Sequence, residues 1–387
     1  MSGRVVVAVE QLRRSVPGGI GRYATGLLDG LAQLRAADVE LRASRAPHGV
    51  PDPLSEFGFP VCASVLPARV LTRAWDLGIA PVRHGRIVHS VSLASPPVRP
   101  TRRRGGPALV VTVHDLAWRT HPDTTTARGR RWHEAALARA LARADAFVVP
   151  SLPVSDSLVS AGADPRRVRV IPHGVDHLPA PDHEAAAALL ARAGVRDGYL
   201  LAAATREPRK NLRRLTEAYA RARGSLRAPW PLVVVGPSGW GDVGVDRVEG
   251  VVESGPVGDA VLAALYEGAR VFAYVPLAEG FGLPPVEAMA CGTPVVVSTA
   301  VPSTTPAPGT SPAALRVDPT TVEQIAAALV RASGDDALRD ELVARAKDLV
   351  RPLSWVASAE AHVEWWEMTA SGGAMPGRQA PGGAVAG

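Results

Sequence analysis

Short apolar runs alternate along the chain with stretches in which apolar residues recur at helical spacing. In the first half the runs lie at residues 4–9, 87–91, 108–113, 146–149 and 168–171. Helical spacing occupies residues 20–34 and an alanine-rich stretch at 132–144. Continuous apolar runs separated by helices are typical of parallel strands buried on both faces. The first half therefore predicts an α/β unit with helices on both faces of a parallel sheet.

The second half repeats this alternation. Its apolar runs lie at residues 199–203, 232–235, 250–253, 271–274 and 295–298. Residues 176–193, with two prolines and an alanine-rich helix, are the predicted connection between the two units. The end of the chain, residues 371–387, is mostly Gly, Ala and Pro, has little to bury, and is predicted to be disordered.

Composition fits this picture. The 387 residues are 47% hydrophobic and 21% charged, which describes a globular protein of two ordinary domains. No apolar run approaches the roughly 20 residues that span a bilayer. The first ten residues lack the apolar core of a secretory signal, so we expect a cytoplasmic protein.

The formal net charge is +6, but most arginines are scattered, and local clusters occur only at residues 102–104 and 128–131. We expect no nucleic-acid partner. The two clusters are candidates for peripheral contact with the anionic inner face of the cell membrane, and solvated loops are the alternative.

Candidate chemistry is densest in residues 279–294, where Glu279 and Glu287 are separated by seven residues. Pro284 and Pro285 suit the first turn of a helix, which predicts a helix of about two turns that begins beside Gly282 and holds Glu287 in its first turn. Its amino end favours an anion such as a diphosphate, and the neighbouring glycines allow the backbone to approach a ligand.

The two carboxylates suit a sugar nucleotide, because a carboxylate can accept hydrogen bonds from two vicinal hydroxyls. One glutamate would hold a ribose and the other the transferred sugar. The alternative is that Glu287 complements the helix dipole while Glu279 is solvated.

Further candidates follow predicted strands, where ligands bind in open α/β sheets. Arg209 and Lys210, after residues 199–203, can neutralise a diphosphate. Gly18 and Gly19 follow the first strand and suit a phosphate or sugar contact, but their surroundings do not match the dinucleotide fingerprint, which disfavours NAD. His114 ends the strand at 108–113. The alternatives are an ordinary surface turn for the basic residues and a hydrogen-bonded structural histidine for His114.

The order of motifs resembles one family. The matching segments are residues 18–23, 113–116, 143–146, 170–176, 207–211, 234–237, 279–294 and 353–355. Over residues 4–370 the chain is similar to retaining glycosyltransferases of family GT4, and among these to bacterial mannosyltransferases that build O-antigen and related polysaccharides. The resemblance implies the GT-B fold, an α/β class in which two Rossmann-like domains with parallel sheets face each other across a cleft.

The resemblance also implies a division of labour. Residues 1–177 would form an acceptor-binding domain, completed by a returning helix at 354–370. Residues 178–353 would bind the nucleotide sugar. The implied donor is GDP-mannose, and the implied acceptor is a saccharide or a lipid-linked glycan.

Site residues carry over from the family motifs. His114 and Glu279 would be catalytic, Glu287 would bind the ribose, and Lys210 with Arg209 would hold the diphosphate. The full implied donor-binding set is Gly18, Gly19, Arg206, Arg209, Lys210, Gly280, Phe281, Gly282, Leu283 and Glu287. No Asp-x-Asp pair ends a strand, so we expect no metal requirement and no cofactor besides the nucleotide sugar.

Two departures from the family pattern stand out. Ala204 occupies a position where many relatives carry arginine, with Arg206 as a nearby substitute, and residues 299–312 lack a customary glutamate. Three alternatives stay open: a UDP-sugar donor, a sugar-nucleotide epimerase or phosphorylase of similar architecture, and a non-catalytic sugar-nucleotide-binding partner of another transferase.

Overall fold

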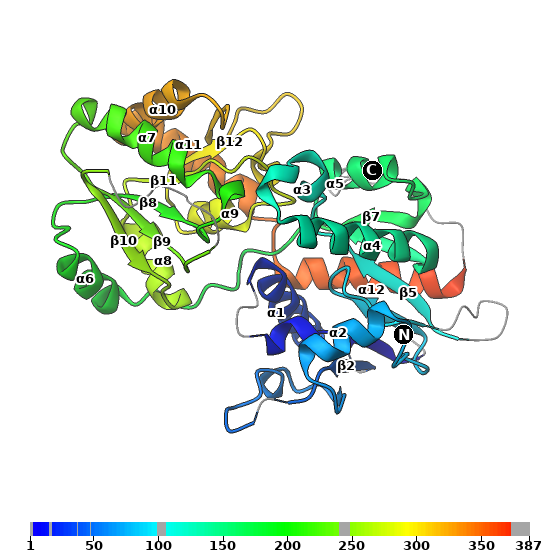
Figure 1. The fold of residues 1–387 in the computed structure, drawn as a ribbon. Coiled ribbons are helices and arrows are strands. Elements are labelled where there is room, and N and C mark those ends of the chain that lie inside the picture. Colours follow the sequence, from blue (N-terminus) through cyan, green and yellow to red (C-terminus); the bar gives the residue numbers. More distant parts are fainter. Residues whose placement is uncertain are drawn as a thin grey trace, which may run out of the picture. The chain divides into compact units, whose positions relative to one another are not determined.

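The computed structural model describes residues 3–14, 18–36, 38–46, 48–98, 106–239 and 248–372. The chain divides into two compact units (Figure 1). Unit 1 comprises residues 1–119, 125–174 and 354–387, and unit 2 comprises residues 120–124 and 175–353. The arginines at 102–104 and the predicted disordered tail from residue 373 onward lie outside the described residues.

Unit 1 is built on seven parallel strands in the order β3-β2-β1-β4-β5-β6-β7. Its strands are β1 (Val5–Ala8), β2 (Val39–Ala43), β3 (Val61–Ala63), β4 (Ile87–Ser90), β5 (Ala108–Thr112), β6 (Ala146–Val149) and β7 (Val168–Val170). The main helices are α1 (Gly18–Gln33), α2 (Ala68–Asp76), α3 (Ala117–Thr120), α4 (Ala127–Arg143), α5 (Leu152–Ser160) and α12 (Trp355–Ser371).

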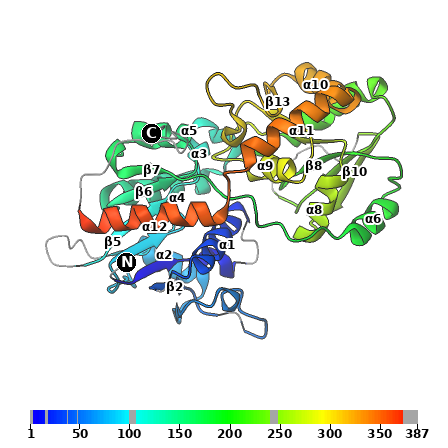
Figure 2. The same ribbon diagram turned by 180° about the vertical axis from the view of Figure 1, so that it is seen from behind.

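Alternation along each strand divides the core of unit 1 into two layers. Val5 and Val7 of β1 belong to a layer with α1 and α12, whereas Val6 belongs to a layer that includes α4 and α5. Figure 2 shows α12 crossing the back of this sheet beside α1. Unit 1 therefore combines its first helix with the last helix of the chain on one face.

Glycines allow α1 and α12 to approach closely. A Cβ added at Gly26 would lie 2.1 Å from the Trp355 ring, and one at Gly30 would lie 2.2 Å from the Trp355 carbonyl oxygen. Trp355, Trp365 and Trp366 of α12 are almost fully buried. Burial of such large side chains is the main stabilising contribution that α12 makes to unit 1.

Unit 2 has six parallel strands in the order β10-β9-β8-β11-β12-β13. The strands are β8 (Leu200–Ala203), β9 (Leu232–Val235), β10 (Val251–Gly255), β11 (Val271–Tyr274), β12 (Val295–Ser298) and β13 (Leu315–Val317). The helices are α6 (His183–Arg192), α7 (Leu212–Ala222), α8 (Asp259–Gly268), α9 (Leu283–Ala290), α10 (Val322–Gly334) and α11 (Asp336–Val350). One core layer includes α8 and α9, and the other includes α7 and α10.

All ten strands predicted from the apolar runs are confirmed within one or two residues at their ends. The strands β2, β3 and β13 were not predicted. The helix expected at residues 20–34 begins two residues earlier, so Gly18 and Gly19 lie in the first turn of α1, where Gly18 adopts a φ of 62°. Glu287 was expected in the first turn of its helix but is the fifth residue of α9, because that helix begins at Leu283.

Candidate functional site

Three predicted site residues converge at the carboxyl edge of the unit 2 sheet. Arg209 and Lys210 follow β8, and Glu279 follows the adjacent strand β11. The Lys210 Nζ forms an ion pair with Glu279 Oε1, and an Arg209 guanidinium nitrogen lies 3.2 Å from the same oxygen. All three side chains keep some exposure, between 11% and 20%. The other guanidinium nitrogen of Arg209 lies 2.8 Å from Glu207 Oε1. The sheet thus gathers two cations and two carboxylates where a ligand can reach them.

Tyr274, the last residue of β11, completes this cluster. Its hydroxyl donates a hydrogen bond of 2.7 Å to Glu279 Oε1 and accepts one of 2.8 Å from Lys210 Nζ. Burial, reinforced by the charge of Glu279, raises the pKa of Tyr274 well above its usual value, so the phenol stays protonated. The sequence analysis missed Tyr274, although its place at a strand end could have pointed to it.

The charges of the cluster are fixed by mutual attraction. Burial alone raises the pKa of Glu279, but the opposing charges of Lys210 and Arg209 outweigh burial and bring that pKa to about 2. Glu279 is therefore ionised at neutral pH. Its charge offsets part of the positive charge that a phosphate would meet.

Local backbone bonds hold the basic turn in place. Pro208–Lys210 forms a 3-10 turn that ends at Asn211, which has a left-handed φ of 59°. The buried Asn211 side chain donates to the carbonyls of Val275 at 2.9 Å and Pro319 at 2.7 Å. The Leu277 amide donates to the Arg209 carbonyl at 2.9 Å. These bonds tie the loop after β8 to the loop after β11, so Lys210 and Glu279 are presented together.

The glycine-rich segment 280–282 leads directly into α9. Gly282 has a φ of 94°, and a Cβ there would lie 2.4 Å from Val301 Cγ1. Its carbonyl accepts a hydrogen bond of 2.8 Å from the Ser303 hydroxyl, and the Ser303 amide donates to the Phe281 carbonyl at 3.0 Å. Phe281 and Leu283 are buried in the unit 2 core. Gly282 is required here both by its φ and by the close approach of Val301.

Glu287 belongs to a second, deeper group. It is 2% exposed, and its carboxylate contacts His177 Nε2 at 3.0 Å and accepts a hydrogen bond of 3.1 Å from the Tyr266 hydroxyl. The two acidic residues of the motif therefore occupy different surroundings. Sequence reasoning missed His177 and Tyr266, since neither belongs to a spacing that signals a ligand.

Arg206 is not part of the Lys210 cluster. Its guanidinium forms an ion pair with Glu253 of β10. The backbone of Arg206 packs closely against Gly239, where an added Cβ would meet the Arg206 carbonyl oxygen at 1.9 Å. The cations that lie with Glu279 are Arg209 and Lys210.

In unit 1, His114 follows β5 and lies against aromatic rings. Its Nε2 donates a hydrogen bond of 2.8 Å to the Val91 carbonyl, which assigns the proton to that nitrogen. The Tyr23 ring meets it edge-on at 4.8 Å between centroids, and the His173 ring lies at 5.8 Å. Burial lowers the pKa of His114, although the Val91 carbonyl and Asp115 oppose that shift, and the imidazole is neutral at pH 7.

Tyr23 also belongs to a buried chain of hydrogen bonds whose direction is set by its ends. The Trp366 indole can only donate, here to His89 Nδ1 at 2.8 Å, so His89 Nε2 donates to the Thr112 hydroxyl at 2.9 Å. At the other end, His362 Nδ1 donates to the Ser358 carbonyl at 2.6 Å, so its Nε2 accepts from the Tyr23 hydroxyl at 2.8 Å. The remaining bond, 3.0 Å long, must run from Thr112 to Tyr23.

Both histidines of this hydrogen-bond chain, His89 and His362, are neutral. Burial lowers the pKa of His362 to about 4 and that of His89 well below its usual value. Protonation of His362 would give Nε2 a proton directed at a hydroxyl that already donates to it. These hydrogen bonds therefore connect α12 to β4, β5 and α1 only while His362 stays neutral.

Gly18 and Gly19 lie apart from these contacts. A Cβ at either position would meet nothing within 4 Å, so packing does not require glycine at either one. The left-handed φ of Gly18 does favour glycine there.

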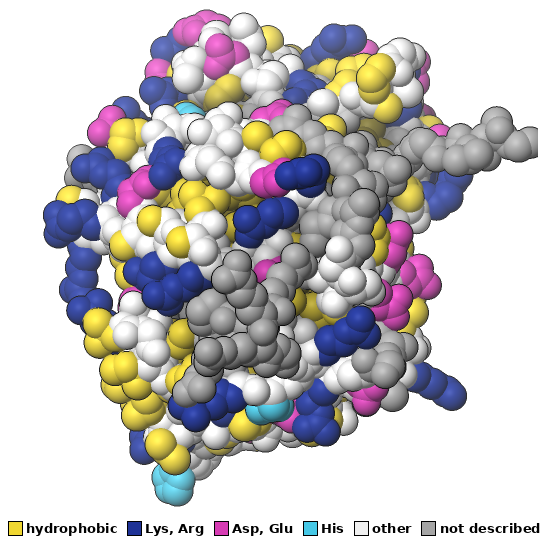
Figure 3. Space-filling view, turned by 90° about the vertical axis from the view of Figure 1, so that its right-hand side faces the viewer, with side chains coloured by type: hydrophobic (Ala, Val, Ile, Leu, Met, Phe, Trp, Pro, Cys, Tyr) yellow, Lys and Arg dark blue, Asp and Glu magenta, His cyan; other side chains and the backbone are white. Residues whose placement is uncertain are grey.

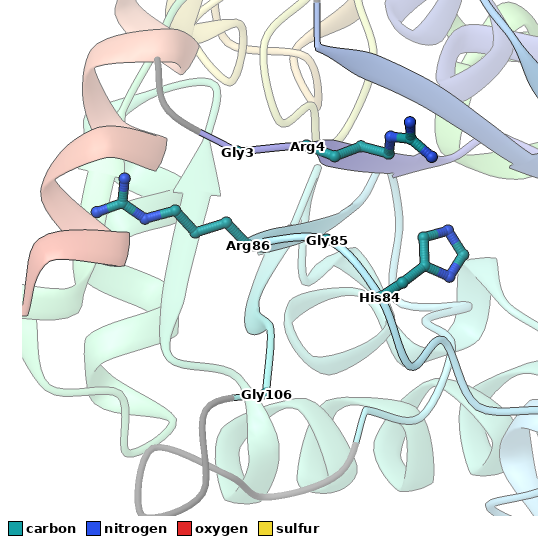
Figure 4. A pocket seen from close by; sticks show the side chains of 6 residues that line it. All are labelled: Gly3, Arg4, His84, Gly85, Arg86 and Gly106. Atoms are coloured by element: carbon teal, nitrogen blue, oxygen red, sulfur yellow. The ribbon is translucent and has the colours of Figure 1, made fainter.

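An open hollow of about 630 Å³ lies at the opposite edge of unit 1, lined by Gly3, Arg4, His84, Gly85, Arg86 and Gly106 (Figure 4). Arg4 and His84 are both committed to Glu40, at 2.8 and 2.6 Å. In Figure 4 the Arg4 and Arg86 side chains point in opposite directions. The hollow lies at the amino ends of β1 and β4, so we do not assign the donor to it.

Figure 3 shows one face of the protein, on which Lys and Arg side chains stand apart from one another among apolar and acidic groups. This matches the scattered arginines of the sequence. Within the described ranges, no three His, Cys, Asp or Glu side chains are grouped so that they could hold a metal ion. None of the helices in the described part of the chain is both long and apolar enough to cross a membrane.

Two Rossmann-like units, each with a parallel sheet and polar residues at its carboxyl edge, define the class as the GT-B fold of glycosyltransferases. Residues 17–177 match the model described as Glycosyltransferase Family 4, and residues 197–335 match the model described as Glycosyl transferases group 1. Each half of the chain thus matches a glycosyltransferase model, and residues 17–177 match family 4.

Individual proteins agree with this assignment. O-antigen chain mannosyltransferase B of Escherichia coli is 38% identical over 170 residues, which are 41% of this chain and 42% of that protein. D-inositol 3-phosphate glycosyltransferase of Rhodococcus opacus is 31% identical over 291 residues, 69% of this chain and 63% of that protein. Each match covers less than two thirds of the curated relative.

A solved structure supports the fold. The crystal structure of Anabaena HepE in complex with UDP and glucose superposes with a TM-score of 0.67 at 17% identity, covering 93% of this chain and 98% of that one. At this identity the similarity concerns the fold alone. Together these comparisons confirm the predicted family and fold class.

Proposed function

We propose that this chain is a retaining glycosyltransferase that moves a hexose from a nucleotide sugar to a cytoplasmic saccharide or lipid-linked glycan, with mannose from GDP-mannose as the donor. The observation that carries the proposal is the cluster of Arg209, Lys210, Tyr274 and Glu279 at the carboxyl edge of the unit 2 sheet. Curated relatives named as mannosyltransferases support the mannosyl part.

In the proposed reaction, the nucleoside diphosphate leaves as an anion while the sugar becomes positively charged at the anomeric carbon. Lys210 and Arg209 would bind the diphosphate and stabilise its developing charge, an effect worth roughly 3 kcal/mol for one fixed group in comparable sites. The incoming phosphates would take the place of Glu279 on Lys210. Glu279 would then be available to accept hydrogen bonds from the hydroxyls of the donor sugar.

The remaining roles follow the motifs. Glu287 would hold the ribose, with His177 and Tyr266 orienting its carboxylate at 3.0 and 3.1 Å. The backbone of residues 280–283 would approach the donor. Gly18, Gly19 and Arg206 stay in the proposed set as secondary contacts. His114 would act at the reacting centre as a neutral imidazole, in keeping with its lowered pKa.

A panel of GDP-, UDP-, ADP- and dTDP-sugars tests the donor by calorimetry and by slow donor hydrolysis. Selective binding of GDP-mannose is the expected result. Preference for a UDP-sugar would leave the fold and the class of reaction standing and replace mannose, and this second candidate is favoured by the UDP and glucose bound to HepE. Loss of hydrolysis in EDTA would overturn the expected metal independence.

A non-catalytic partner of another transferase is tested separately. Replacing His114 by Ala should abolish turnover and leave nucleotide binding at unit 2 unchanged. A protein that merely binds sugar nucleotides would keep its biological role after this substitution, and that outcome would reject the enzymatic proposal.

A further inference from the structure

Exposed apolar side chains are concentrated in one segment of unit 1. Among the described residues, seven large hydrophobic side chains are exposed, and five of them fall between residues 61 and 79. These five are Val61 (37% exposed), Val65 (84%), Val70 (49%), Leu77 (62%) and Ile79 (57%). Single exposed apolar residues need no explanation, but five within nineteen residues mark an interaction surface.

The segment is firmly anchored although these side chains are exposed. Leu71 and Trp75 of α2 are buried with Ala8, and Leu66 and Ala80, at the two ends of the segment, pack on the same cluster. Arg69, Val70 and Arg73 lie on the outer side of the helix. Val70 therefore lies on a helix with a fixed inner face, and Val65, Leu77 and Ile79 lie in the segments that lead into and out of it.

The carboxyl end of α2 presents its apolar residues in a defined turn. Gly78, with a φ of 75°, donates to the Trp75 carbonyl at 3.0 Å, and Ile79 donates to the Ala74 carbonyl at 2.8 Å. This is a Schellman motif, in which the residue after the glycine usually packs back on the helix. Here Leu77 and Ile79 stay exposed on either side of Gly78, so a rigid turn holds two large apolar side chains in solvent.

Charge indicates which surface fits this segment. The charged residues of segment 61–79 are Arg69, Arg73 and a single acidic residue, Asp76. Asp76 is already engaged, because it accepts a hydrogen bond of 3.0 Å from the Trp132 indole and pairs with Arg139. Glu10, on the short helix that contacts α2, is buried and paired with Arg14 at 2.9 Å.

We propose that Val65, Val70, Leu77 and Ile79, together with Arg69 and Arg73, form a surface that binds anionic lipid headgroups, named here the α2 patch. The arginines would contact the phosphates while the apolar side chains enter the interface between headgroups and acyl chains. A surface that combines exposed aliphatic side chains with arginines, and whose one carboxylate is already paired, suits the phosphates and the apolar layer of an anionic bilayer. The α2 patch would give a location to the membrane contact expected for a lipid-linked acceptor. It rests on the proposed function only through that expected acceptor.

Cosedimentation with vesicles tests the α2 patch without any activity assay. The full chain should bind vesicles that contain phosphatidylglycerol and should bind phosphatidylcholine vesicles weakly. The variant Leu77→Ser/Ile79→Ser should lower the partition coefficient by about tenfold, because it removes two apolar side chains from the interface. Arg69→Gln/Arg73→Gln should lower it by a similar factor, about tenfold, and abolish its dependence on salt.

Matched variants separate this surface from others. Leu152→Ser removes an exposed apolar residue of the same unit elsewhere, and Arg128→Gln/Arg130→Gln removes two of the three exposed arginines at the start of α4. Both should bind vesicles like the unchanged chain. A greater loss in either control than in Leu77→Ser/Ile79→Ser would overturn the assignment to the α2 patch.

Two other outcomes would reject the proposal. The unchanged chain could fail to bind anionic vesicles. Alternatively, sedimentation could show a dimer that Leu77→Ser/Ile79→Ser converts to a monomer, which would make the patch an interface between copies. GDP binding by each variant reports on unit 2 independently, so failure of the donor assignment and failure of the α2 patch give different results.

Discussion

The carboxyl edges of the two sheets place polar groups in equivalent positions but use opposite chemistry. The unit 2 edge holds ionised groups, Lys210, Arg209 and Glu279, which remain partly exposed. Behind the unit 1 edge lies a fully buried chain of neutral groups that includes Tyr23, His89 and His362. One edge keeps charges available for an anionic ligand, whereas the other uses uncharged hydrogen bonds to fix the surroundings of His114.

Of the substitutions that test this difference between the two edges, removal of Lys210 should have the largest effect on turnover. Lys210→Ala deletes a cation from the unit 2 cluster, and we expect turnover to fall by on the order of 100- to 1,000-fold, as for other fixed electrostatic groups. Calorimetry should show weaker binding of nucleoside diphosphate. Lys347→Ala is the matched control, since Lys347 is exposed on α11. Equal activity of the two variants would contradict the proposed phosphate site.

The next largest effect should be a loss of stability in acid, which should begin at a higher pH in unit 1 than in unit 2. His362 has a folded pKa of about 4 and an ordinary value near 6.5, so the unfolded state binds more protons between these pH values. The stability of unit 1 should therefore decline as pH falls from about 6.5 towards 4, by on the order of 3 kcal/mol for a shift of this size. Glu279 contributes in a lower window, from its ordinary 4.5 down to about 2.

Hydrogen exchange can follow both windows in one experiment. Protection of β4 and β5 should decline at a higher pH than protection of β8 and β11. The variant His362→Gln should flatten the response of unit 1 and leave that of unit 2 unchanged. Simultaneous loss of protection in both sheets would argue against the buried neutral chain.

Neutralising Glu279 should separate binding from turnover. In Glu279→Gln, Lys210 loses its competing carboxylate while Arg209 keeps its ion pair with Glu207, so free nucleoside diphosphate should bind about tenfold more tightly, as for a modest change in charge pairing. Turnover of the donor sugar should fall, because the proposed acceptor of its hydroxyl hydrogen bonds is weakened. Calorimetry measures diphosphate binding, and donor hydrolysis measures turnover. Weaker diphosphate binding would contradict the proposal that Glu279 competes with the diphosphate.

The smallest expected effect belongs to Tyr274. Tyr274→Phe removes one hydroxyl that contacts both Lys210 and Glu279, and we expect turnover to fall by about tenfold, as for loss of one hydrogen bond to a charged group. Tyr199→Phe is the control in the same unit. Tyr199 lies directly before β8, and its hydroxyl donates to the Leu265 carbonyl at 2.7 Å. Similar losses in both variants would indicate a general effect on the fold.

Sequence alone predicted the strands that are continuous apolar runs, because such runs are buried on both faces. It missed β3, which contains only three residues and is exposed at Val61 and Ala63. It also missed β2, whose apolar run is interrupted by Glu40 and Arg42. Of these two strands only β3 lies at the edge of the sheet, where one edge and part of its faces remain in solvent and the apolar signal is weak; β2 lies between β3 and β1.

The candidate site was predicted as far as its residues lay in motifs. Lys210 and Glu279 are separated by 69 residues, and only the adjacency of β8 and β11 brings them together. His177 gains its contact with Glu287 from tertiary packing, so no local spacing could identify it, whereas the position of Tyr274 at the end of a predicted strand was a usable signal. The ion pair of Arg206 with Glu253 was equally hidden, because it depends on the position of β10.

The contact between α1 and α12 has a consequence for synthesis on the ribosome. Trp355, Trp365 and Trp366 complete a core layer that begins with Val5 and α1, so most of the chain must be made before that layer can close. The described part of unit 2 between residues 175 and 353 emerges earlier and contains its own core. A chain without α12 should therefore have a folded unit 2 while unit 1 still exposes the apolar groove that α12 fills, and a released chain that ends before residue 355 should populate that state.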